Sequence, residues 1–324
     1  MTSRREFITL SSAAVAGFGL PAAAQSDRPV ALIVGFPPGG SGDTVARALA
    51  QSLQGSYASS VMVDNRPGAG GRIALQYVKS AQANGNFLIQ VPISTMAIYP
   101  HVYRNLPYDP LKDFVPVGRV AKFQFALCVG PAVPESVRTL ADFATWCRAN
   151  PGRASFGSQG EGTMGHFAGF MIAQAAVFNM AHVAYKGSAP ALQDVLGGHI
   201  PASIQIQSEA IPYVKDGRLR ALVATGRSRI PQLPLVPTLA ELGHSGMAAE
   251  EYFAVFAPAG TPQDVIQRLS QAIERAMDTP QLREKLEALG FEPAAADARA
   301  LARLLKEDLE RWGPIVRATG FQAS

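Results

Sequence analysis

Residues 30–44 join a buried-type strand, a tight turn and the start of a helix, and this order constrains the fold more than any other feature. Val30–Phe36 is a continuous apolar run of strand length, and the two prolines that follow prevent its continuation. Three of the four residues in Gly39–Gly42 are glycines, which let bare backbone come close to a ligand. A helix is predicted from about Thr44, with its free N–H groups and positive dipole end directed at the turn. The segment predicts either an anion-binding strand–helix unit or a plain strand–helix connection.

Strands and helices are predicted to alternate along most of the remaining chain, which is typical of an α/β fold. The further strand candidates are 61–65, 87–91, 124–129, 154–157, 182–185, 203–206, 219–225 and 252–257. The main helix candidates are 139–150, 166–177, 189–196, 262–277 and 298–312, the last one stopped by Gly313 and Pro314. We expect two smaller sheets instead of one open array, because so many strands in one sheet are uncommon.

Composition is consistent with two domains and argues against nucleic-acid binding. The 324 residues are 48% hydrophobic and 17% charged, which is enough apolar material for two ordinary cores. The net charge of +4 is mild, and no Lys/Arg run with interleaved aromatics is present. We expect one domain to be formed by residues 25–127 and 251–324, and the other by residues 128–250.

The N-terminus has the pattern of an export signal. Arg4 and Arg5 precede a short apolar stretch, and Ala22–Ala24 forms a small-residue cleavage site before Gln25. Residues 1–24 therefore read as a twin-arginine signal, or as an ordinary secretory signal with a chance arginine pair. No later stretch is long and apolar enough to span a membrane, so we expect an exported, soluble periplasmic protein.

The only two cysteines, Cys128 and Cys147, lie on consecutive predicted elements. An oxidising compartment permits a disulfide between them, and two buried free thiols are the alternative. Neither cysteine has the surroundings of a nucleophile.

Gly160–Gly165 matches the G-x-G-x-x-G pattern between a predicted strand and a predicted helix. A dinucleotide site also needs an acidic residue about twenty positions further on, where this chain has Tyr185, Lys186 and Gly187. A cofactor-dependent enzyme is thus a minor alternative, and a second anion site at a helix start is the simpler interpretation.

Other catalytic patterns are absent from the sequence. The five histidines include no H-E-x-x-H, and neither G-x-S-x-G nor G-x-x-x-x-G-K-[ST] occurs. We therefore expect no catalytic residue, no metal and no cofactor.

Several motifs, in order and spacing, resemble the periplasmic receptors of tripartite tricarboxylate transporters, also called Bug receptors. They are 35–43 (GFPPGGSGD), 64–71 (DNRPGAGG), 106–110 with 112–114 (LPYDP, KDF), 182–192 (HVAYKGSAPAL) and 257–262 (APAGTP). The resemblance implies a two-domain, type II-like periplasmic binding protein that closes on a small organic acid without catalysis. It also implies membrane transporter subunits as partners, and we expect a monomer. An orphan receptor that acts in signalling without uptake is a further alternative.

The resemblance also implies where the ligand binds: the first strand–helix loop, the loop at 158–163 and a third small polar loop. The ligand-binding residues expected from it are Phe36, Gly39, Gly40, Ser41, Thr44, Ser94, Thr95, Ser158, Gln159, Thr163 and Gln205. Gln205 stands where the family frequently has an aspartate in the cleft, and Gln207 is the alternative occupant of that position. A neutral amide offers no charge to an ammonium group, so this position argues against an amino acid as the ligand.

Overall fold

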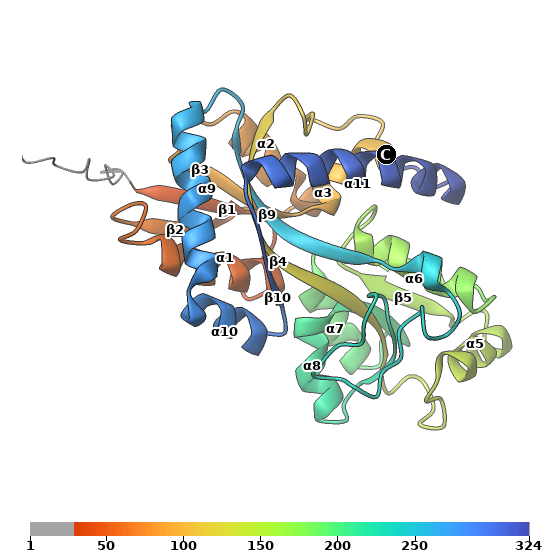
Figure 1. The fold of residues 1–324 in the computed structure, drawn as a ribbon. Helices are drawn as coiled ribbons and strands as arrows, with labels where there is room; N and C mark the ends of the chain where they lie inside the picture. The colour runs from red at the N-terminus through yellow and green to blue at the C-terminus, as the bar shows by residue number, and fades with distance from the viewer. Residues whose placement is uncertain (1–28, 324) are drawn as a thin grey trace, which may run out of the picture.

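The computed structural model describes residues 29–323, which form two lobes joined by extended strands (Figure 1). The predicted export signal, residues 1–24, lies outside the described residues. Elements from both ends of the chain build the lobe at the upper left of Figure 1, and the central part of the chain builds the lobe at the lower right. The alternation of strands and helices thus gives the α/β fold that the sequence predicts.

The strands are β1 (Val30–Val34), β2 (Val61–Asn65), β3 (Phe87–Pro92), β4 (Phe114–Val129), β5 (Ser155–Ser158), β6 (Ala181–Ala184), β7 (Ala202–Ile206), β8 (Arg220–Ala224), β9 (Glu250–Pro258) and β10 (Glu292–Ala296). The α-helices are α1 (Ser41–Leu53), α2 (Arg72–Lys79), α3 (Ser94–Ala97), α4 (Tyr99–Val102), α5 (Leu140–Ala149), α6 (Met164–Ala175), α7 (Ser188–Leu196), α8 (Gln207–Lys215), α9 (Gln263–Asp278), α10 (Pro280–Ala288) and α11 (Ala298–Thr319). Two short 3₁₀ turns, η1 (Ala69–Gly71) and η2 (Ser245–Met247), complete the described elements.

The long strand β4 joins the two lobes. Hydrogen-bonded neighbours run in the order β2-β1-β3-β9-β4-β7-β5-β6, with β8 and β10 also paired to β4. Strands β1, β2 and β3 are parallel, as are β5, β6 and β7, whereas β4 and β9 are antiparallel to their neighbours. The expected two separate sheets are therefore two parts of one continuous array, because β4 belongs to both.

The pairing partners of β4 change in its middle. Its first part pairs with β9 as far as Gln124, and its second part pairs with β7 from Phe125 onward. We call residues 29–124 and 250–323 lobe 1, and residues 125–249 lobe 2. The change of partner comes between residues 124 and 125, near the domain boundary that the sequence suggests at 127/128.

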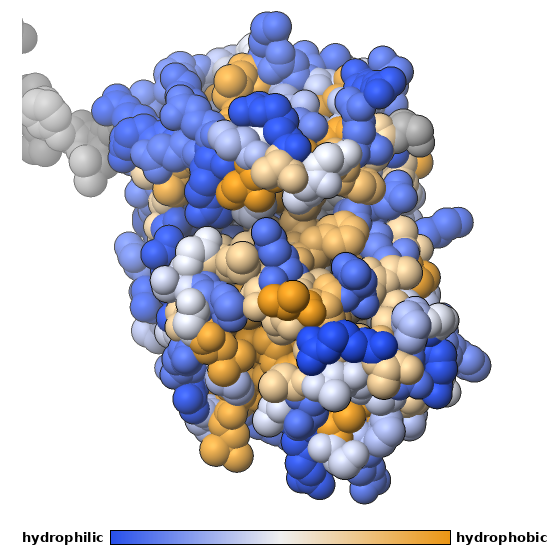
Figure 2. Space-filling model, turned by 90° about the vertical axis from the view of Figure 1, so that its right-hand side faces the viewer, coloured by the Kyte–Doolittle hydropathy of each residue, from blue (hydrophilic) through white to orange (hydrophobic). Residues whose placement is uncertain are grey.

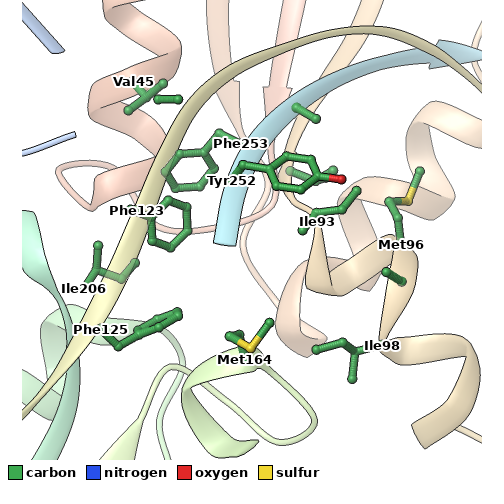
Figure 3. Close-up of a cluster of buried hydrophobic side chains, with 14 of the residues drawn as sticks. Val45, Ile93, Met96, Ile98, Phe123, Phe125, Met164, Ile206, Tyr252 and Phe253 are labelled. Carbon is green, nitrogen blue, oxygen red and sulfur yellow. The ribbon is translucent and has the colours of Figure 1, made fainter. Parts of the chain in front are cut away.

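A buried apolar cluster lies where the lobes meet. Figure 3 shows Phe123 on β4 beside Phe253 on β9, with Phe125, Ile206 and Met164 below them toward lobe 2. The rings of Phe123 and Phe253 stack with their centres 4.6 Å apart. A second, smaller cluster lies under α7 and α8 in lobe 2, and the rest of the lobe 2 core is continuous with the first cluster.

Three elements differ from the prediction. The predicted strand 124–129 is only the second part of β4, and β10 was not predicted. The last helix does not stop at Gly313 and Pro314, because α11 continues to Thr319. A proline inside a helix removes one hydrogen bond, and the burial of Trp312 and Val316 holds the helix together across it.

Both cysteines are free and buried, and burial raises the pKa of each thiol to about 12. Of the alternatives left open by the sequence, the structure therefore has two free thiols.

Within residues 29–323, no helix has the length and apolar character needed to cross a membrane. On the face in Figure 2, hydrophobic atoms gather around the middle of the molecule and hydrophilic atoms dominate its upper edge.

Candidate functional site in the cleft between the lobes

Two adjoining cavities lie between the lobes. The inner cavity has a volume of about 50 Å³ and is lined from lobe 1 by the start of α1 and from lobe 2 by the starts of α7 and α8. The outer cavity, of about 580 Å³, is lined by the loop before α2 and by the loops that follow β5 and β6. The two cavities share Phe36, Pro37, Gln159 and Gly187, so they form one continuous cleft.

Helix α1 begins in the cleft and receives its cap from the other lobe. Gly40 is its N-cap residue and has no side chain to cap the helix. The Ser41 N–H donates to Glu209 Oε1 at 3.0 Å, and the Ser41 hydroxyl donates to the same oxygen at 2.6 Å. Glu209 lies on α8, so a lobe 2 carboxylate occupies the first free N–H of a lobe 1 helix.

Hydrogen bonds within the turn hold the α1 start in place. The Gly39 N–H donates to Asp43 Oδ2 at 2.9 Å, and the Thr44 hydroxyl donates to the Gly40 carbonyl at 3.0 Å. Burial alone would raise the pKa of Asp43, but hydrogen bonds from Arg47 and the Gly39 N–H outweigh it and lower the pKa. Gly39, Thr44 and Asp43 thus shape the turn and line neither cavity.

Helix α6 begins behind the β5–α6 loop, which lines the outer cavity through residues 159–161, and the helix is capped by its own sequence. Thr163 is the N-cap residue, and its hydroxyl oxygen accepts from the His166 N–H at 3.4 Å and donates to the Gly160 carbonyl at 2.8 Å. The Ser158 hydroxyl contacts Gly160 O at 3.3 Å and His182 Nε2 at 2.8 Å. These bonds give the β5–α6 loop a fixed shape from within lobe 2.

A histidine pair supports that loop. The rings of His166 and His182 stack with their centres 3.8 Å apart, and the Gly162 N–H donates to His166 Nδ1 at 3.1 Å. Burial lowers the pKa of His166 to about 3, helped by the neighbouring His182, and burial lowers the pKa of His182 to about 4. Both rings are therefore neutral near pH 7, which suits the acceptor role of His166.

The third predicted loop holds a second glutamate beside the inner cavity. The Ser94 N–H donates to Glu251 Oε1 at 2.9 Å, and the Thr95 hydroxyl donates to the Pro92 carbonyl at 3.0 Å. Glu251 is 1% exposed and lines the inner cavity. Burial raises its pKa to about 7, against the lowering effect of the Ser94 hydrogen bonds.

The predicted site residues fall into three groups: residues that line the cavities, residues that shape the loops behind them, and Gln205. Phe36, Gly40, Ser41 and Gln159 line the cavities. A second group shapes the loops behind the cavity walls without lining them: Gly39, Thr44, Ser94, Thr95, Ser158 and Thr163.

Gln205 does not lie on the cleft wall. It is fully buried on β7, opposite Ala126 of β4, and lines neither cavity, and its two side-chain polar atoms have no hydrogen-bond partner. Along a strand, alternate residues face opposite sides, and Ile206 is the β7 residue that lines the inner cavity. The argument from Gln205 against an amino acid therefore loses its structural basis.

Sequence reasoning missed Glu209, Glu251 and the aromatic wall formed by Phe123 and Phe253. The two glutamates stand in no recognisable motif, and only the packing of the lobes brings them to one cavity. Lys186 and Gly187 could have been found, because both lie in the quoted 182–192 motif.

The two lobes are in contact at several points around the cleft. Gly187 has a φ of +121°, and a Cβ built on it would lie 3.4 Å from Pro37 Cδ in the opposite lobe. The Tyr103 hydroxyl donates to the Glu161 carbonyl across the outer cavity at 3.0 Å, and Gln207 Nε2 donates to the Gly290 carbonyl. The structure thus has the lobes closed on each other.

The glycines of the G-x-G-x-x-G pattern have local reasons in this fold. Gly160 and Gly162 adopt φ values of +144° and +71°, and a Cβ on Gly165 would lie 2.3 Å from Gln159 Oε1. The described residues contain no group of three His, Cys, Asp or Glu side chains that could hold a metal ion.

The molecule has two α/β lobes with a ligand-sized cleft between them, and helix starts and glycine-rich loops line this cleft. This arrangement defines a periplasmic-binding-protein fold. The sequence model of the tripartite tricarboxylate transporter family receptors matches residues 45–321. Protein BugT of Bordetella pertussis is 34% identical over 312 residues, which make up 95% of this chain and 94% of BugT. The chain therefore belongs to the tripartite tricarboxylate transporter receptor family.

Solved structures agree with this assignment. A protein from R. palustris solved with adipate has a TM-score of 0.85 at 32% identity, over 91% of this chain and 98% of that chain. MatC from Rhodopseudomonas palustris, solved with bound malate, has a TM-score of 0.81 at 28% identity, over 89% of this chain and 99% of that chain.

Proposed function

We propose that this chain is a periplasmic receptor that captures a small organic carboxylate between its lobes and delivers it to a tripartite tricarboxylate-type membrane transporter. The observation that carries the proposal is the cleft itself, where loops from both lobes face a cavity of suitable size. The adipate and malate bound by the two relatives support a carboxylate as the ligand.

The outer cavity has the donors that a carboxylate needs. Arg72 and Lys186 line it together with the glycine-rich loops 68–71 and 159–160. A hydrogen bond to a charged group contributes about 1.5 to 3 kcal/mol, and micromolar affinity corresponds to about 8 kcal/mol. A few such bonds are therefore enough for receptor-like binding after the ordering costs are met.

We propose further that the lobes move as two domains about the two chain crossings, at residues 124/125 in β4 and at 249/250 before β9. Contacts that bridge the lobes, such as Ser41 with Glu209, would then form on closure. Residues 1–24 would direct the chain to the periplasm, with the mature protein starting at or near Gln25.

The test is calorimetry and thermal shift of the purified mature chain with a carboxylate panel that includes malate, adipate and aspartate. We expect at least one acid to bind with a one-to-one ratio and to raise the melting temperature, because a ligand that binds only the folded state stabilises it. Cell fractionation should find the mature chain in the periplasm. No binding by any acid, with an intact fold, would contradict the proposal.

A further inference from the structure

The inner cavity is acidic. Glu209 and Glu251 line it, and none of the described residues that line it is a lysine, arginine or histidine. Glu209 Oε1 accepts two hydrogen bonds from Ser41, whereas its Oε2 is buried without a partner. A buried carboxylate oxygen without a partner is costly, so this end of the cleft calls for a hydrogen-bond donor.

The second carboxylate comes from the other lobe. Glu251 on β9 lines the inner cavity, is 1% exposed, and its Oε1 accepts from the Ser94 N–H at 2.9 Å. The inner cavity therefore presents carboxylate oxygens from both lobes, with phenylalanine rings around them. The carboxylate oxygens, in these apolar surroundings, favour a cation over an anion.

The outer cavity has the opposite character. Arg72 and Lys186 line it, with Glu161 as its only acid, and neither cation forms an ion pair with a carboxylate of residues 29–323. The guanidinium of Arg72 rests 3.8 Å from the centre of the Tyr103 ring, and its Nε donates to the Ala69 carbonyl at 2.9 Å. Its terminal nitrogens remain available to an anion.

We propose that the ligand is a small zwitterion whose ammonium group enters the inner cavity between Glu209 and Glu251 and whose carboxylate lies in the outer cavity near Arg72 and Lys186. Glu209 is then a specificity-determining residue. This inference rests on the proposed function, because it concerns the same cleft, and it narrows the ligand from carboxylates in general to those that carry an amine.

The charge of the inner cavity selects this assignment, and its size permits it. The inner cavity of about 50 Å³ has room for an ammonium group, and the outer cavity of about 580 Å³ has room for the rest of the ligand. A ligand carboxylate in the inner cavity would lie beside Glu209 and would compete with it for the α1 amide. Like charges at such short range repel, whereas an ammonium would satisfy Glu209 Oε2.

The test compares ligands that differ only at the nitrogen. Aspartate is paired with malate, which has a hydroxyl in place of the ammonium, and 6-aminohexanoate is paired with adipate. We expect the wild-type chain to bind the amine member of at least one pair ten or more times more tightly in calorimetry. Glu209→Gln keeps the volume and removes the charge, so it should reduce that ratio to threefold or less.

Glu284→Gln is the matched control. Glu284 lies on α10, is exposed and lines neither cavity of the cleft, so its replacement should leave the ratio unchanged. If Glu209→Gln does not fold, as judged by circular dichroism, Glu209→Ser provides the same readout without the charge.

The outcomes separate the two proposals. Tighter binding of malate or adipate than of the amine partners would overturn the zwitterion and leave the receptor function standing. An amine preference that persists in Glu209→Gln and in Glu209→Ser would remove Glu209 as its cause. No binding by either member of any pair would contradict the receptor function and the zwitterion together.

Discussion

Helices α1 and α6 each follow a glycine-rich loop that lines the cleft, but their starts are capped in different ways. Helix α6 is capped by Thr163, the residue directly before it, whereas α1 has the glycine Gly40 at that position and receives Glu209 from the other lobe. The partners of the first cap are 3 residues apart, and those of the second are 168 residues apart. One helix start is therefore complete within its own lobe, and the other is complete only when the lobes are closed.

This difference implies different roles for the two parts of the site. The β5–α6 loop is a fixed wall, held by Thr163 and by the histidine pair behind it. The start of α1 is the responsive part of the site, because its first amide pairs with Glu209 only when the lobes are closed and with water when they are open. Changes at the β5–α6 loop should therefore act mainly on stability, and changes at the start of α1 mainly on binding.

The largest expected effect concerns acid and the histidine pair. The folded pKa values of His166 and His182, about 3 and about 4, lie below the ordinary value of 6.5. Between these limits the unfolded chain binds more protons, so stability falls as the pH drops below about 6.5. Each of the two histidines should lower the free energy of unfolding by about 2 kcal/mol between pH 7 and pH 5.

Urea unfolding at pH 7 and pH 5 measures this loss. His182→Gln should lose about 2 kcal/mol less than the wild type over that range, because one of the two ionisations is gone. His199→Gln, at an exposed histidine, is the control and should behave like the wild type. Equal losses in His182→Gln and in the wild type would show that the pair is not the source.

Glu251 changes the free energy of unfolding in the opposite direction as the pH falls. Its folded pKa of about 7 lies above the ordinary value of 4.5, so between these limits the folded chain binds more protons and this contribution grows as the pH falls. Glu251→Gln should therefore show a larger acid loss than the wild type, by about 2 kcal/mol.

A smaller effect is expected on ligand affinity at the α1 start. Gly40→Val places two extra methyl groups beyond the Cβ at the inner cavity, so we expect binding to weaken at least about tenfold, or about 1.4 kcal/mol, with the fold intact. Gly40→Ala is the matched control, because its Cβ would lie at ordinary contact distances of 3.6 Å from Pro37 O and 3.9 Å from Glu209 Oε1. Unchanged calorimetric affinity in Gly40→Val would remove this loop from the site.

The smallest effect compares the two caps directly. Thr163→Ala removes a local helix cap and should lower the free energy of unfolding by about 1 kcal/mol, with recovery in Thr163→Ser. Ser41→Ala removes a hydrogen bond to Glu209 that, in the proposed domain motion, exists only with the lobes closed. The folded protein can open and avoid this cost, so the loss in the free energy of unfolding should be less than half as large. Chemical unfolding of the three variants checks the order, and a larger loss in Ser41→Ala would reverse the comparison.

Much of the fold follows from local patterns. Strand β2 has the predicted bounds, and most other strands and helices fall within a few residues of theirs, because apolar runs and turn residues act over short distances. The first ten residues of β4 were missed because Pro116 and Gly118 interrupt the strand pattern, and β10 because its sequence is Glu-Pro-Ala-Ala-Ala. Pairing with β9 holds the first part of β4 extended despite those residues.

The sequence by itself determined the family, the α/β alternation and the loops that enter the cleft, because each depends on residues a few positions apart. Only the tertiary structure decided which side chains face the ligand. The alternation along β7 turned Gln205 away from the cleft wall, and the meeting of the lobes brought Glu209 and Glu251 to one small cavity. The direction of a side chain on a strand depends on the register of the strand, and a contact between the lobes depends on their closure. Neither can be predicted from a short stretch of sequence.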